Sequence, residues 1–484
     1  MRHKLFLLGI ILSLTLTAFA HSGKPRMYAI VDTDCAADDL RTLCMLLGDH
    51  DIEILAITTS EGALTPQHGY RKVKALLNDF YHQGIPVAPG REVHAPAPEW
   101  RHIARAIPWG DSVPADMPEL TAEELLIRTI GNEKKPVTLI CLGALTNISD
   151  ALTTDPRLKE KIERLVWYNS GASPISGINY ETDPEAARKV MDSGINMLLV
   201  SSADQASAPV DRQFLTELGY LQNSRYAQKV AETHAIPPLR ELIRDEHLRI
   251  WDELTVLALN SPQLFNKDSL SPAIEWYSID VPRKIRPIEQ QILAVYQGPE
   301  NTEGKVFYHF PLDEGYYIRD IMPIIGRAVQ RYGLSEFRAA VLTNELHGHL
   351  GIFATVGVKM GIRAREYFDI GVDDMHVTTY AGNRPPVSCL NDGLQVSTGG
   401  TLGHGLITVA EVKAGDTRPE ATFTFKNKKV TLRLKPEYER RVREDLKKGV
   451  ETYGADTEAN WQYVRALAIQ YWLDWDRHEI FDIL

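Results

Sequence analysis

Short apolar runs alternate with amphipathic stretches from residue 27 to about residue 200. The apolar runs have the length and composition of buried strands, and the stretches between them repeat their apolar residues at helical spacing. This alternation predicts βαβ units, and therefore a parallel sheet with helices on both faces. The predicted strands are Tyr28–Asp32, Ile54–Thr59, Ile85–Ala88, Val137–Leu142, Leu165–Tyr168 and Met197–Val200, and the predicted helices are Asp38–Leu47, Pro66–Leu77, Ala122–Ile130, Asn147–Leu152 and Pro184–Met191.

The pattern changes in the middle of the chain. Residues 210–259 follow helical spacing, and we expect a strand region over Ile274–Phe310 and then a helix over Tyr317–Tyr332. The character changes again at residues 333–337, which indicates a domain boundary there. A chain of 484 residues is longer than one core usually serves, so we expect two domains. Their predicted bounds are residues 25–333 and 336–484.

The second of these domains mixes helical and β patterns. A four-residue polar link, residues 426–429, joins two β-rich runs and predicts a hairpin. The predicted elements are helix Val356–Tyr367, strand Met375–Tyr380, hairpin strands Thr422–Phe425 and Val430–Leu434, and a charged helical tail, Tyr438–Leu484. They indicate a smaller α+β domain.

The N-terminus has the pattern of an export signal. A basic start, Arg2 to Lys4, precedes the apolar run Leu5–Leu16 and the small-residue cleavage site Ala18-Phe19-Ala20. We therefore predict a signal peptide over residues 1–20 and a periplasmic or secreted mature chain that starts at His21. An uncleaved anchor is the alternative, but the apolar run is short for a spanning helix.

Charge and cysteine content narrow the class of protein. The net charge of -11 and the lack of a basic cluster in the sequence argue against a nucleic-acid partner. No later segment is apolar and long enough to span a membrane. The four cysteines, Cys35, Cys44, Cys141 and Cys389, lack the spacing of a disulfide framework.

Four carboxylates follow the apolar run Met27–Val31 within eight residues: Asp32, Asp34, Asp38 and Asp39. The carboxyl ends of parallel strands are where open sheets bind ligands. Acidic side chains this close repel one another unless a cation lies among them, and oxygen ligands suit Ca²⁺ or Mg²⁺. The alternative is an acidic helix start, where Asp caps the first turn and complements the helix dipole. That alternative explains Asp38 and Asp39 better than Asp32 and Asp34.

Three later segments stand where they could complete such a site. Gly143–Asn147 follows a predicted strand, Asn179–Glu185 precedes a helix, and Trp251–Glu253 opens another helix. Each also has a purely structural explanation, because each contains a residue that could serve only as a helix cap.

Taken together and in this order, these segments resemble the inosine-uridine preferring nucleoside hydrolase family over about residues 27–333. The matching residues are Asp32-Thr33-Asp34 with Asp38-Asp39, Leu145-Thr146-Asn147, Asn179 with Asp183-Pro184-Glu185-Ala186-Ala187, and Asp252. The resemblance implies an α/β fold with an open, mostly parallel sheet and flanking helices. It also implies hydrolysis of the N-glycosidic bond of nucleosides or related ribosyl compounds.

The same resemblance implies roles for individual residues. A Ca²⁺ ion would also hold a water and the sugar 2′- and 3′-hydroxyls, and Asp34 would be the general base that takes a proton from that water. Asp38 and Asn179 would contact the substrate. The implied ligands of the ion are Asp34, Asp39, the backbone carbonyl of Thr146, and Asp252.

The substrate side departs from the family pattern. Cys35-Ala36 replaces the usual Pro-Gly, Ala63 replaces an Asn, and Gly177 replaces a Glu, so two substrate contacts are lost. Glu61 is a candidate substitute for the first of them. Trp251 stands where the family often has a His that assists departure of the base. An indole could instead stack on an aromatic leaving group or form a wall of the pocket.

The C-terminal third carries a second constellation. His347-Gly348-His349 places two imidazoles on one turn, and Cys389 follows about forty residues later. These are candidate Zn²⁺ ligands, and the alternative is a histidine loop beside a buried Cys. With Cys389 to Gln395 and Thr398 to Gly405, the motif resembles the FmdE-like domains of the formylmethanofuran dehydrogenase family over residues 336–484. That resemblance implies a fold and a metal, but no reaction, and Gly351 stands where the family has a Cys.

These features predict an exported two-domain hydrolase that depends on Ca²⁺ and acts on a small nucleoside or sugar substrate. The C-terminal domain would bind a metal or small ligand, and it would shape the pocket or a homo-oligomer. One rival hypothesis is a non-catalytic, Ca²⁺-dependent nucleoside- or sugar-binding protein, which the losses at Ala63, Gly177 and Trp251 favour and the presence of Asp34 opposes. The other rival is a Zn²⁺-dependent activity in the C-terminal domain.

Overall fold

The structure, a computed structural model, describes residues 25–49, 51–111, 119–202, 207–298, 306–307, 309–413 and 415–484. It divides into two compact units. The N-terminal unit is Met27–Leu312 with Glu366–Asp369, and the C-terminal unit is Asp313–Arg365 with Ile370–Leu484. The predicted signal peptide, residues 1–20, lies outside the described residues. Within the described ranges, no helix has both the length and the apolar content that a membrane crossing requires.

An eight-stranded sheet forms the centre of the N-terminal unit, in the order β3-β2-β1-β4-β5-β8-β10-β9. All neighbouring strands are parallel except β9 and β10, which pair antiparallel. All eight residues of β2 are buried, as expected for a parallel sheet covered on both faces. The strands are β1 (Met27–Thr33), β2 (Ile52–Thr59), β3 (Val87–Pro89), β4 (Val137–Cys141), β5 (Ile162–Tyr168), β8 (Met197–Ser201), β9 (Asn266–Ser271) and β10 (Ile274–Ser278), and a separate two-stranded sheet pairs β6 (Gly171–Ala172) with β7 (Ile175–Ser176).

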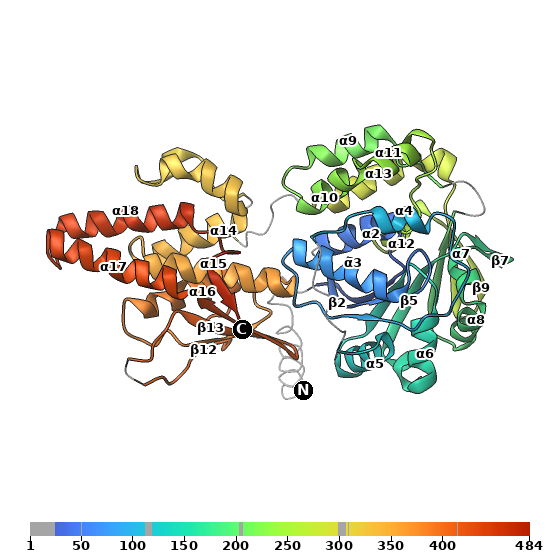
Figure 1. Cartoon of the computed structure of the whole chain (residues 1–484), viewed down its shortest axis with the longest axis horizontal. Coiled ribbons are helices and arrows are strands. Elements are labelled where there is room, and N and C mark those ends of the chain that lie inside the picture. Colours follow the sequence, from blue (N-terminus) through green and yellow to red (C-terminus); the bar gives the residue numbers. More distant parts are fainter. Residues whose placement is uncertain are drawn as a thin grey trace, which may run out of the picture. The chain divides into compact units, whose positions relative to one another are not determined.

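Helices cover both faces of this sheet (Figure 1). One core contains apolar residues of α2, α3, α10, α12 and α13, and the other contains residues of α5, α6 and α8. The helices are α2 (Ala37–Gly48), α3 (Pro66–Asp79), α4 (Arg101–Ala106), α5 (Ala122–Asn132), α6 (Thr146–Thr154), α7 (Ile178–Thr182), α8 (Pro184–Asp192), α9 (Arg212–Tyr220), α10 (Arg225–His234), α11 (Pro237–Arg244), α12 (Glu253–Asn260) and α13 (Val281–Gln297), with 3-10 turns at Pro156–Glu160 and Pro262–Leu264. The predicted strands and helices of the first 200 residues are all confirmed, with shifts of a few residues at their ends.

Two predictions for the middle of the chain are wrong. In the described residues of the expected strand region over Ile274–Phe310, one strand, β10, is followed by the long helix α13. Pro282 lies in the first turn of this helix, where Pro is accepted, and Pro287 lies inside it. The expected helix over Tyr317–Tyr332 begins later, because 3-10 turns at Glu314–Tyr316 and Met322–Ile324 precede α14 (Ile325–His347).

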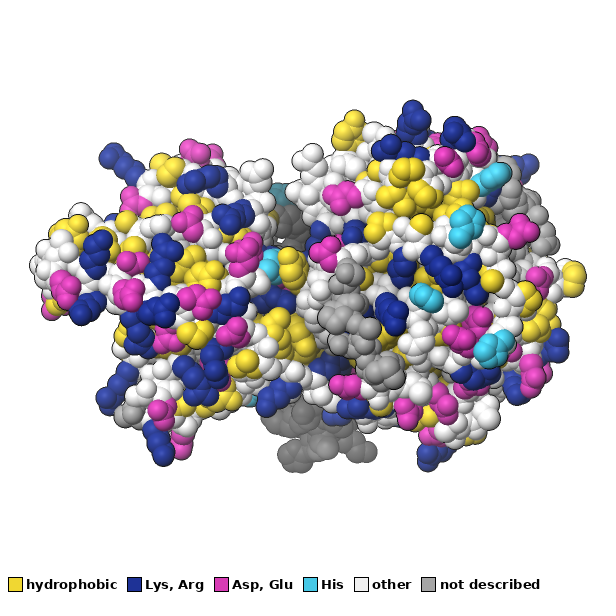
Figure 2. Space-filling model, viewed as in Figure 1, with side chains coloured by type: hydrophobic (Ala, Val, Ile, Leu, Met, Phe, Trp, Pro, Cys, Tyr) yellow, Lys and Arg dark blue, Asp and Glu magenta, His cyan; other side chains and the backbone are white. Residues whose placement is uncertain are grey.

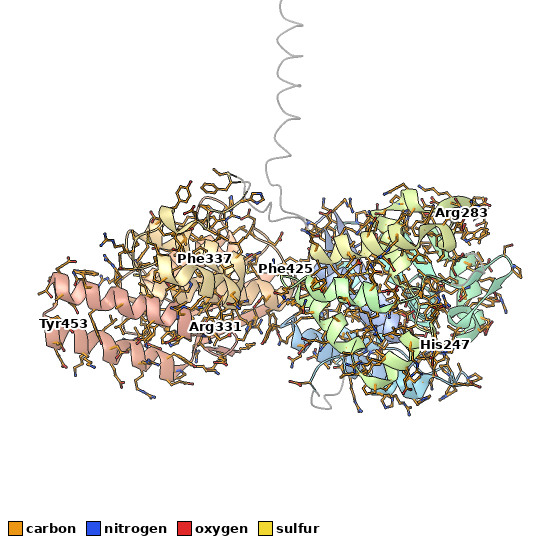
Figure 3. All side chains as sticks on the ribbon, turned by 90° about the horizontal axis from the view of Figure 1, so that it is seen from above. His247, Arg283, Arg331, Phe337, Phe425 and Tyr453 are labelled. Carbon is orange, nitrogen blue, oxygen red and sulfur yellow. The ribbon has the colours of Figure 1, made fainter. Side chains whose placement is uncertain are left out.

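The C-terminal unit packs helices on a five-stranded sheet with the order β12-β11-β13-β14-β15. Phe337 of α14, which Figure 3 labels, stacks on Trp472 of α18 in the core of this unit, with 5.7 Å between the ring centroids. The elements are α14, α15 (Ile352–Phe368), α16 (Leu390–Thr398), α17 (Pro436–Tyr453) and α18 (Glu458–Asp474), β11 (His376–Thr379), β12 (Ile407–Val409), β13 (Glu420–Phe425), β14 (Lys428–Leu434) and β15 (Phe481–Ile483), and a 3-10 turn at Val387–Cys389. The smaller α+β domain is therefore confirmed.

Two details of this unit differ from expectation. The hairpin of β13 and β14 exists, but its link is Lys426-Asn427 rather than four residues, because Phe425 pairs directly with Lys428. The two units divide after Leu312, whereas the composition changes at residues 333–337. Gly333 marks that later point with a non-helical backbone inside α14 (φ 84°, ψ 162°). All four cysteines are free thiols in the structure.

Candidate active site

The turn after β1 is built around the carboxylate of Asp39. It accepts the backbone N–H groups of Asp34 (3.2 Å), Cys35 (3.3 Å) and Ala36 (3.0 Å), and the hydroxyl of Thr33. Cys35 adopts a left-handed conformation (φ 67°), which turns the chain around this carboxylate. Asp39 therefore caps the start of α2, as the structural alternative proposed.

Asp32 joins β1 to the neighbouring elements. Its Oδ2 accepts the Thr58 hydroxyl of β2 and the side-chain amide of Asn147 at the start of α6, each at 2.6 Å. Asn147 fits only because residue 90 is a glycine, since a β-carbon there would lie 1.9 Å from Asn147 Oδ1. The Asp32 carboxylate thus fixes the Leu145-Thr146-Asn147 segment at the carboxyl edge of the sheet.

Asp252 differs from the other helix-start aspartates. Asp183 caps α8 by accepting the N–H of Ala186 (3.1 Å), but Asp252, at the start of α12, forms no such side-chain bond. Its carboxylate instead lies with those of Asp38 and Asp39. Among the described residues, these three form the one group of at least three His, Cys, Asp or Glu side chains whose ligand atoms all lie within 4.8 Å of one another.

Asp34 lies beside this group and faces the loop after β2. Its Oδ2 accepts the N–H of Ala63 at 3.0 Å. A β-carbon on Gly62 would lie 2.0 Å from that oxygen, and one on Gly143 would lie 2.9 Å from Asp34 Cβ. The two glycines therefore make the space that the Asp34 side chain occupies. Its roles as metal ligand and general base stay predictions.

The electrostatics of the group favour a bound cation. Burial, and then the negative charge of Asp39, raises the pKa of Asp38 to about 8 and that of Asp34 well above the usual value. Burial and the charges of Asp38 and Asp39 likewise raise the pKa of Asp252 well above its usual value. Buried carboxyls that resist ionisation in this way become stable anions when a divalent cation with a preference for oxygen lies among them. The donor set fits Ca²⁺ or Mg²⁺.

The remaining segments that resemble the nucleoside hydrolase family meet at the same carboxyl edge of the sheet. The Thr146 hydroxyl donates to Asp183 Oδ2 at 2.8 Å, which joins the start of α6 to the start of α8. Asn179 is buried, and its Nδ2 donates to the carbonyls of Leu142 (2.9 Å) and Tyr168 (3.0 Å) at the ends of β4 and β5. The structure therefore gathers these segments, while their contacts with an ion or a sugar stay predictions.

Glu61 and Trp251 have clear structural contacts. The Glu61 carboxylate accepts the N–H groups of Val93 (2.6 Å) and His94 (3.0 Å) and lies 3.8 Å from the Arg101 guanidinium. Trp251 is half-buried and packs against the apolar core of the N-terminal unit. Glu61 thus holds the 91–94 loop, and for both residues the predicted substrate contact is untested.

Sequence reasoning missed a buried ion pair next to the carboxylates. Arg41 of α2 pairs with Glu253 of α12, and each side chain is 1% exposed. Arg41 also contacts His234 Nε2 (3.0 Å) and donates to the carbonyl of Arg249 (2.7 Å). Its positive charge partly offsets the rise in the pKa of Asp38. The sequence feature that could have revealed this ion pair is a single Arg inside the apolar run of α2.

In the described part of the C-terminal unit, the predicted zinc ligands lie near one another, but their ligand atoms do not form one group. His347 Nδ1 is 2.7 Å from Asp392 Oδ2, and its buried Nε2 has no hydrogen-bond partner within the described ranges. The His347 and His349 rings are 4.3 Å apart, and Cys389 and His347 line a cavity of about 380 Å³. A β-carbon on Gly351 would lie 2.9 Å from His347 Nε2, so the missing family Cys leaves room for this ring.

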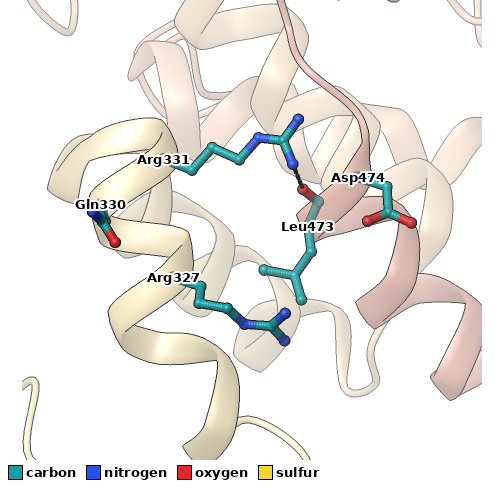
Figure 4. A pocket seen from close by; sticks show the side chains of 5 residues that line it. All are labelled: Arg327, Gln330, Arg331, Leu473 and Asp474. Carbon is teal, nitrogen blue, oxygen red and sulfur yellow. Dashed lines mark hydrogen bonds between the residues drawn. The ribbon is translucent and has the colours of Figure 1, made fainter.

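A second cavity of this unit, of about 420 Å³, contains none of the predicted site residues (Figure 4). Arg331 donates to the carbonyl of Leu473 at 2.9 Å across it. Its lining residues are Arg327, Gln330, Arg331, Leu473 and Asp474.

Comparison with known families assigns both units. Residues 29–318 match the model of the inosine-uridine preferring nucleoside hydrolase family, and residues 346–482 match FmdE, "Molybdenum formylmethanofuran dehydrogenase operon". The first match covers more than half of the chain. The protein therefore belongs to the inosine-uridine preferring nucleoside hydrolase family and carries an FmdE domain at its C-terminal end, which confirms both resemblances.

Individual relatives are similar over part of their length. The pyrimidine-specific ribonucleoside hydrolase RihA of Klebsiella pneumoniae (strain 342) is 29% identical over 189 residues, and that of Salmonella agona (strain SL483) is 32% identical over 185 residues. Each alignment covers 35% of this chain and 58% of the relative, so the chain spans little more than half the length of these proteins.

Solved structures of lower identity also align with the chain. A plant nucleoside hydrolase, PpNRh1, is 18% identical, with a TM-score of 0.47, and the alignment covers 56% of this chain and 100% of that one. A purine-preferring ribonucleoside hydrolase from Gardnerella vaginalis is 18% identical, with a TM-score of 0.45 and coverage of 56% and 99%.

Proposed function

We propose that the protein is an exported, Ca²⁺-dependent hydrolase of the N-glycosidic bond of nucleosides or related ribosyl compounds. The observation that carries the proposal is the buried carboxylate of Asp252 beside Asp38 and Asp39. Helix capping explains Asp39 and Asp183, but it does not explain why Asp252 lies among other carboxylates without a cap bond. Family membership supports the reaction class, and export rests on the pattern of residues 1–20.

The residues of the chain divide the chemistry between them. A bound Ca²⁺ would supply a Lewis acid that lowers the pKa of the attacking water, with Asp34, Asp39, the Thr146 carbonyl and Asp252 as its ligands and Asp38 beside them. Asp34 is fixed by the Ala63 N–H and is the group that would accept the proton of that water. The sugar develops positive charge as the base departs, and the surrounding carboxylates stabilise that charge.

The test compares turnover with binding in the mature full-length protein. Hydrolysis of uridine or inosine should disappear after dialysis against EDTA and return with Ca²⁺. Asp34→Asn should lower kcat by about 100-fold or more while nucleoside binding persists, because a general base contributes about that factor. Wild-type protein that binds nucleosides with Ca²⁺ but releases no base would establish the non-catalytic rival.

A Zn²⁺-dependent activity of the C-terminal unit is the second candidate. The observation that favours it is the His347–Asp392 pair, because a carboxylate commonly holds the outer nitrogen of a metal-ligating His. Activity that survives Asp34→Asn but is lost in His349→Ala would favour this candidate.

A further inference from the structure

One peptide group of the loop after β2 joins a cation to the Asp34 carboxylate. Arg101, the first residue of α4, donates through Nη2 to the carbonyl of Gly62 (2.8 Å) and through Nε to that of Ala63 (3.2 Å). The N–H of Ala63 donates to Asp34 Oδ2 at 3.0 Å. The Gly62 carbonyl and the Ala63 N–H belong to the same peptide group, so the guanidinium and the carboxylate are bound to its two ends.

This arrangement strengthens the bond that holds Asp34. Hydrogen bonds in a chain polarise one another, so a donor on the peptide carbonyl makes the N–H of the same peptide a better donor. The donor on the Gly62 carbonyl is an Arg, and charge-assisted bonds are stronger than neutral ones. Asp34 is 4% exposed and Ala63 is fully buried, so water competes little for these groups.

The loop depends on Arg101 for its carbonyl groups. The Gly62 N–H donates to the carbonyl of Leu64 (3.1 Å), and the Leu64 N–H donates to the carbonyl of Asp34 (3.1 Å). The carbonyls of Gly62 and Ala63 accept the two arms of the Arg101 fork. Removing a partner from buried polar groups of this kind costs their full desolvation, so the loop should rearrange when the fork is lost.

Arg101 itself is presented by a fixed element. Lys72 of α3 donates to the carbonyl of Arg105 at 2.9 Å and also to that of Ile107, so the last turn of α4 is bound to α3. Ile107 is buried in the core of the N-terminal unit. At the other end of α4, Glu61 Oε1 lies 3.8 Å from the Arg101 guanidinium. The fork is therefore held in place before it meets the loop.

We propose that Arg101 is a positioning residue, which fixes the Gly62–Ala63 peptide so that its N–H holds the Asp34 carboxylate in the orientation that the reaction needs. This inference rests on the proposed function, in which Asp34 accepts the proton of the attacking water. Arg101 acts through the loop and not on the substrate. Its loss should therefore change the rate of the chemical step more than substrate binding.

The first test measures kcat and KM of the mature full-length protein at saturating Ca²⁺, with whichever of uridine and inosine it hydrolyses. Arg101→Ala should lower kcat about 10- to 100-fold, the usual loss when a group that orients a metal ligand is removed, and should leave KM unchanged. Arg101→Lys keeps the charge but not the fork, so kcat should fall about tenfold. A raised KM with wild-type kcat in these variants would make Arg101 a substrate contact and overturns the proposal.

Hydrogen exchange gives a second readout that needs no substrate. The N–H groups of Gly62, Ala63 and Leu64 are all bonded, so residues 60–65 should exchange slowly in the wild type. Mass spectrometry should show about tenfold faster exchange of this segment in Arg101→Ala, the factor expected for the loss of a charge-assisted hydrogen bond. Strand β8 is the reference segment and should not change. Unchanged exchange of residues 60–65 overturns the proposal, whatever happens to kcat.

Arg105→Ala is the matched control on the same helix. Lys and Arg side chains lie on the visible surface of the N-terminal unit (Figure 2), and the Arg105 side chain is likewise exposed. The Arg101 side chain, in contrast, is 13% exposed. Lys72 binds the Arg105 carbonyl, which alanine keeps, so kcat and exchange should stay at wild-type values. Equal losses in Arg101→Ala and Arg105→Ala would assign the effect to α4 as a whole and overturn the proposal.

The two proposals fail in distinguishable ways. If the wild type hydrolyses neither uridine nor inosine in the presence of Ca²⁺, the proposed function fails, and hydrogen exchange alone then decides whether Arg101 fixes the loop that holds Asp34. Faster exchange of residues 60–65 in Arg101→Ala than in Arg105→Ala supports that role, and equal exchange in the two variants overturns it.

Discussion

Asp34 and Gly62 fit together so closely that a β-carbon on the glycine would lie 2.0 Å from Asp34 Oδ2. Gly62→Ala must therefore displace the carboxylate or break its bond to the Ala63 N–H. We expect kcat to fall by about 100-fold, the loss that a shift of about 1 Å at a reacting group produces. Steady-state kinetics measures the effect, and circular dichroism should show an intact fold.

Gly131→Ala is the control for that substitution. Gly131 lies in α5, and a β-carbon there meets nothing within 4 Å. Replacing a helical glycine by alanine should raise the free energy of unfolding by about 0.5–1 kcal/mol without changing kcat. Wild-type kcat in Gly62→Ala would show that the position of Asp34 does not limit the reaction.

Removing the cation should make stability depend on pH. In the metal-free fold the pKa of Asp32 is raised by burial to about 6, and that of Asp38 by burial and Asp39 to about 8. In the unfolded chain both carboxyls ionise near pH 4. Because their folded pKa values are raised, their contribution to stability is fully present below about pH 4 and is lost as pH rises through about 6 and 8.

Calorimetry in EDTA and in Ca²⁺ checks this expectation. The Tm of the EDTA-treated protein should fall between pH 5 and pH 8, and Ca²⁺ should raise the Tm more at pH 8, since it binds only the folded, ionised group. Equal Tm increases at both pH values would mean that the ion does not bind these carboxylates.

Asp252 and Asp183 begin two helices but should respond differently to mutation. Asp183→Ala removes the cap on the N–H of Ala186 and should cost about 1 kcal/mol of stability. Asp252→Asn removes no cap and takes one charge out of a buried acidic group, so it should stabilise the EDTA-treated protein while abolishing Ca²⁺ binding. Denaturant unfolding measures the stability of both variants, and calcium titration measures their Ca²⁺ binding. A loss of stability in metal-free Asp252→Asn would show that its carboxylate is structural.

The carboxyl edge of the sheet and the segments that meet there could be predicted from the sequence. Strands such as β1 and β2 are short apolar runs, and their carboxyl ends fall at the same edge in any parallel sheet, so the gathering of Asp32, Asp39 and Asn147 followed from pattern and topology. The motif order added Asn179 and Asp252. The sequence pattern could not distinguish an aspartate that caps a helix from an aspartate that binds a metal ion.

The contacts that distinguish those roles are tertiary. Asp39 accepts three backbone N–H groups because Cys35 adopts a left-handed conformation, which no periodicity reveals. The Arg41–Glu253 pair joins residues that are far apart in the chain. Helix α13 was missed because the whole stretch from Ile274 was assigned to strands, although the helix begins at Val281.

The C-terminal unit contains a buried ion pair whose two partners should not be equally replaceable. Lys359 Nζ lies 2.6 Å from Glu336 Oε1 and 3.6 Å from the Tyr332 ring centroid, and the Lys359 and Glu336 side chains are at most 1% exposed. Arg477 also pairs with Glu336, at 3.0 Å. Glu336→Gln removes the buried carboxylate that two cations share and should cost about 3–5 kcal/mol, whereas Lys359→Met leaves Glu336 paired with Arg477 and should cost less. The exposed pair of Arg443 and Glu439 is the control, since Glu439→Gln should cost at most about 1 kcal/mol in the same urea titration. Equal losses in Glu336→Gln and Glu439→Gln would mean that burial does not set the strength of this network.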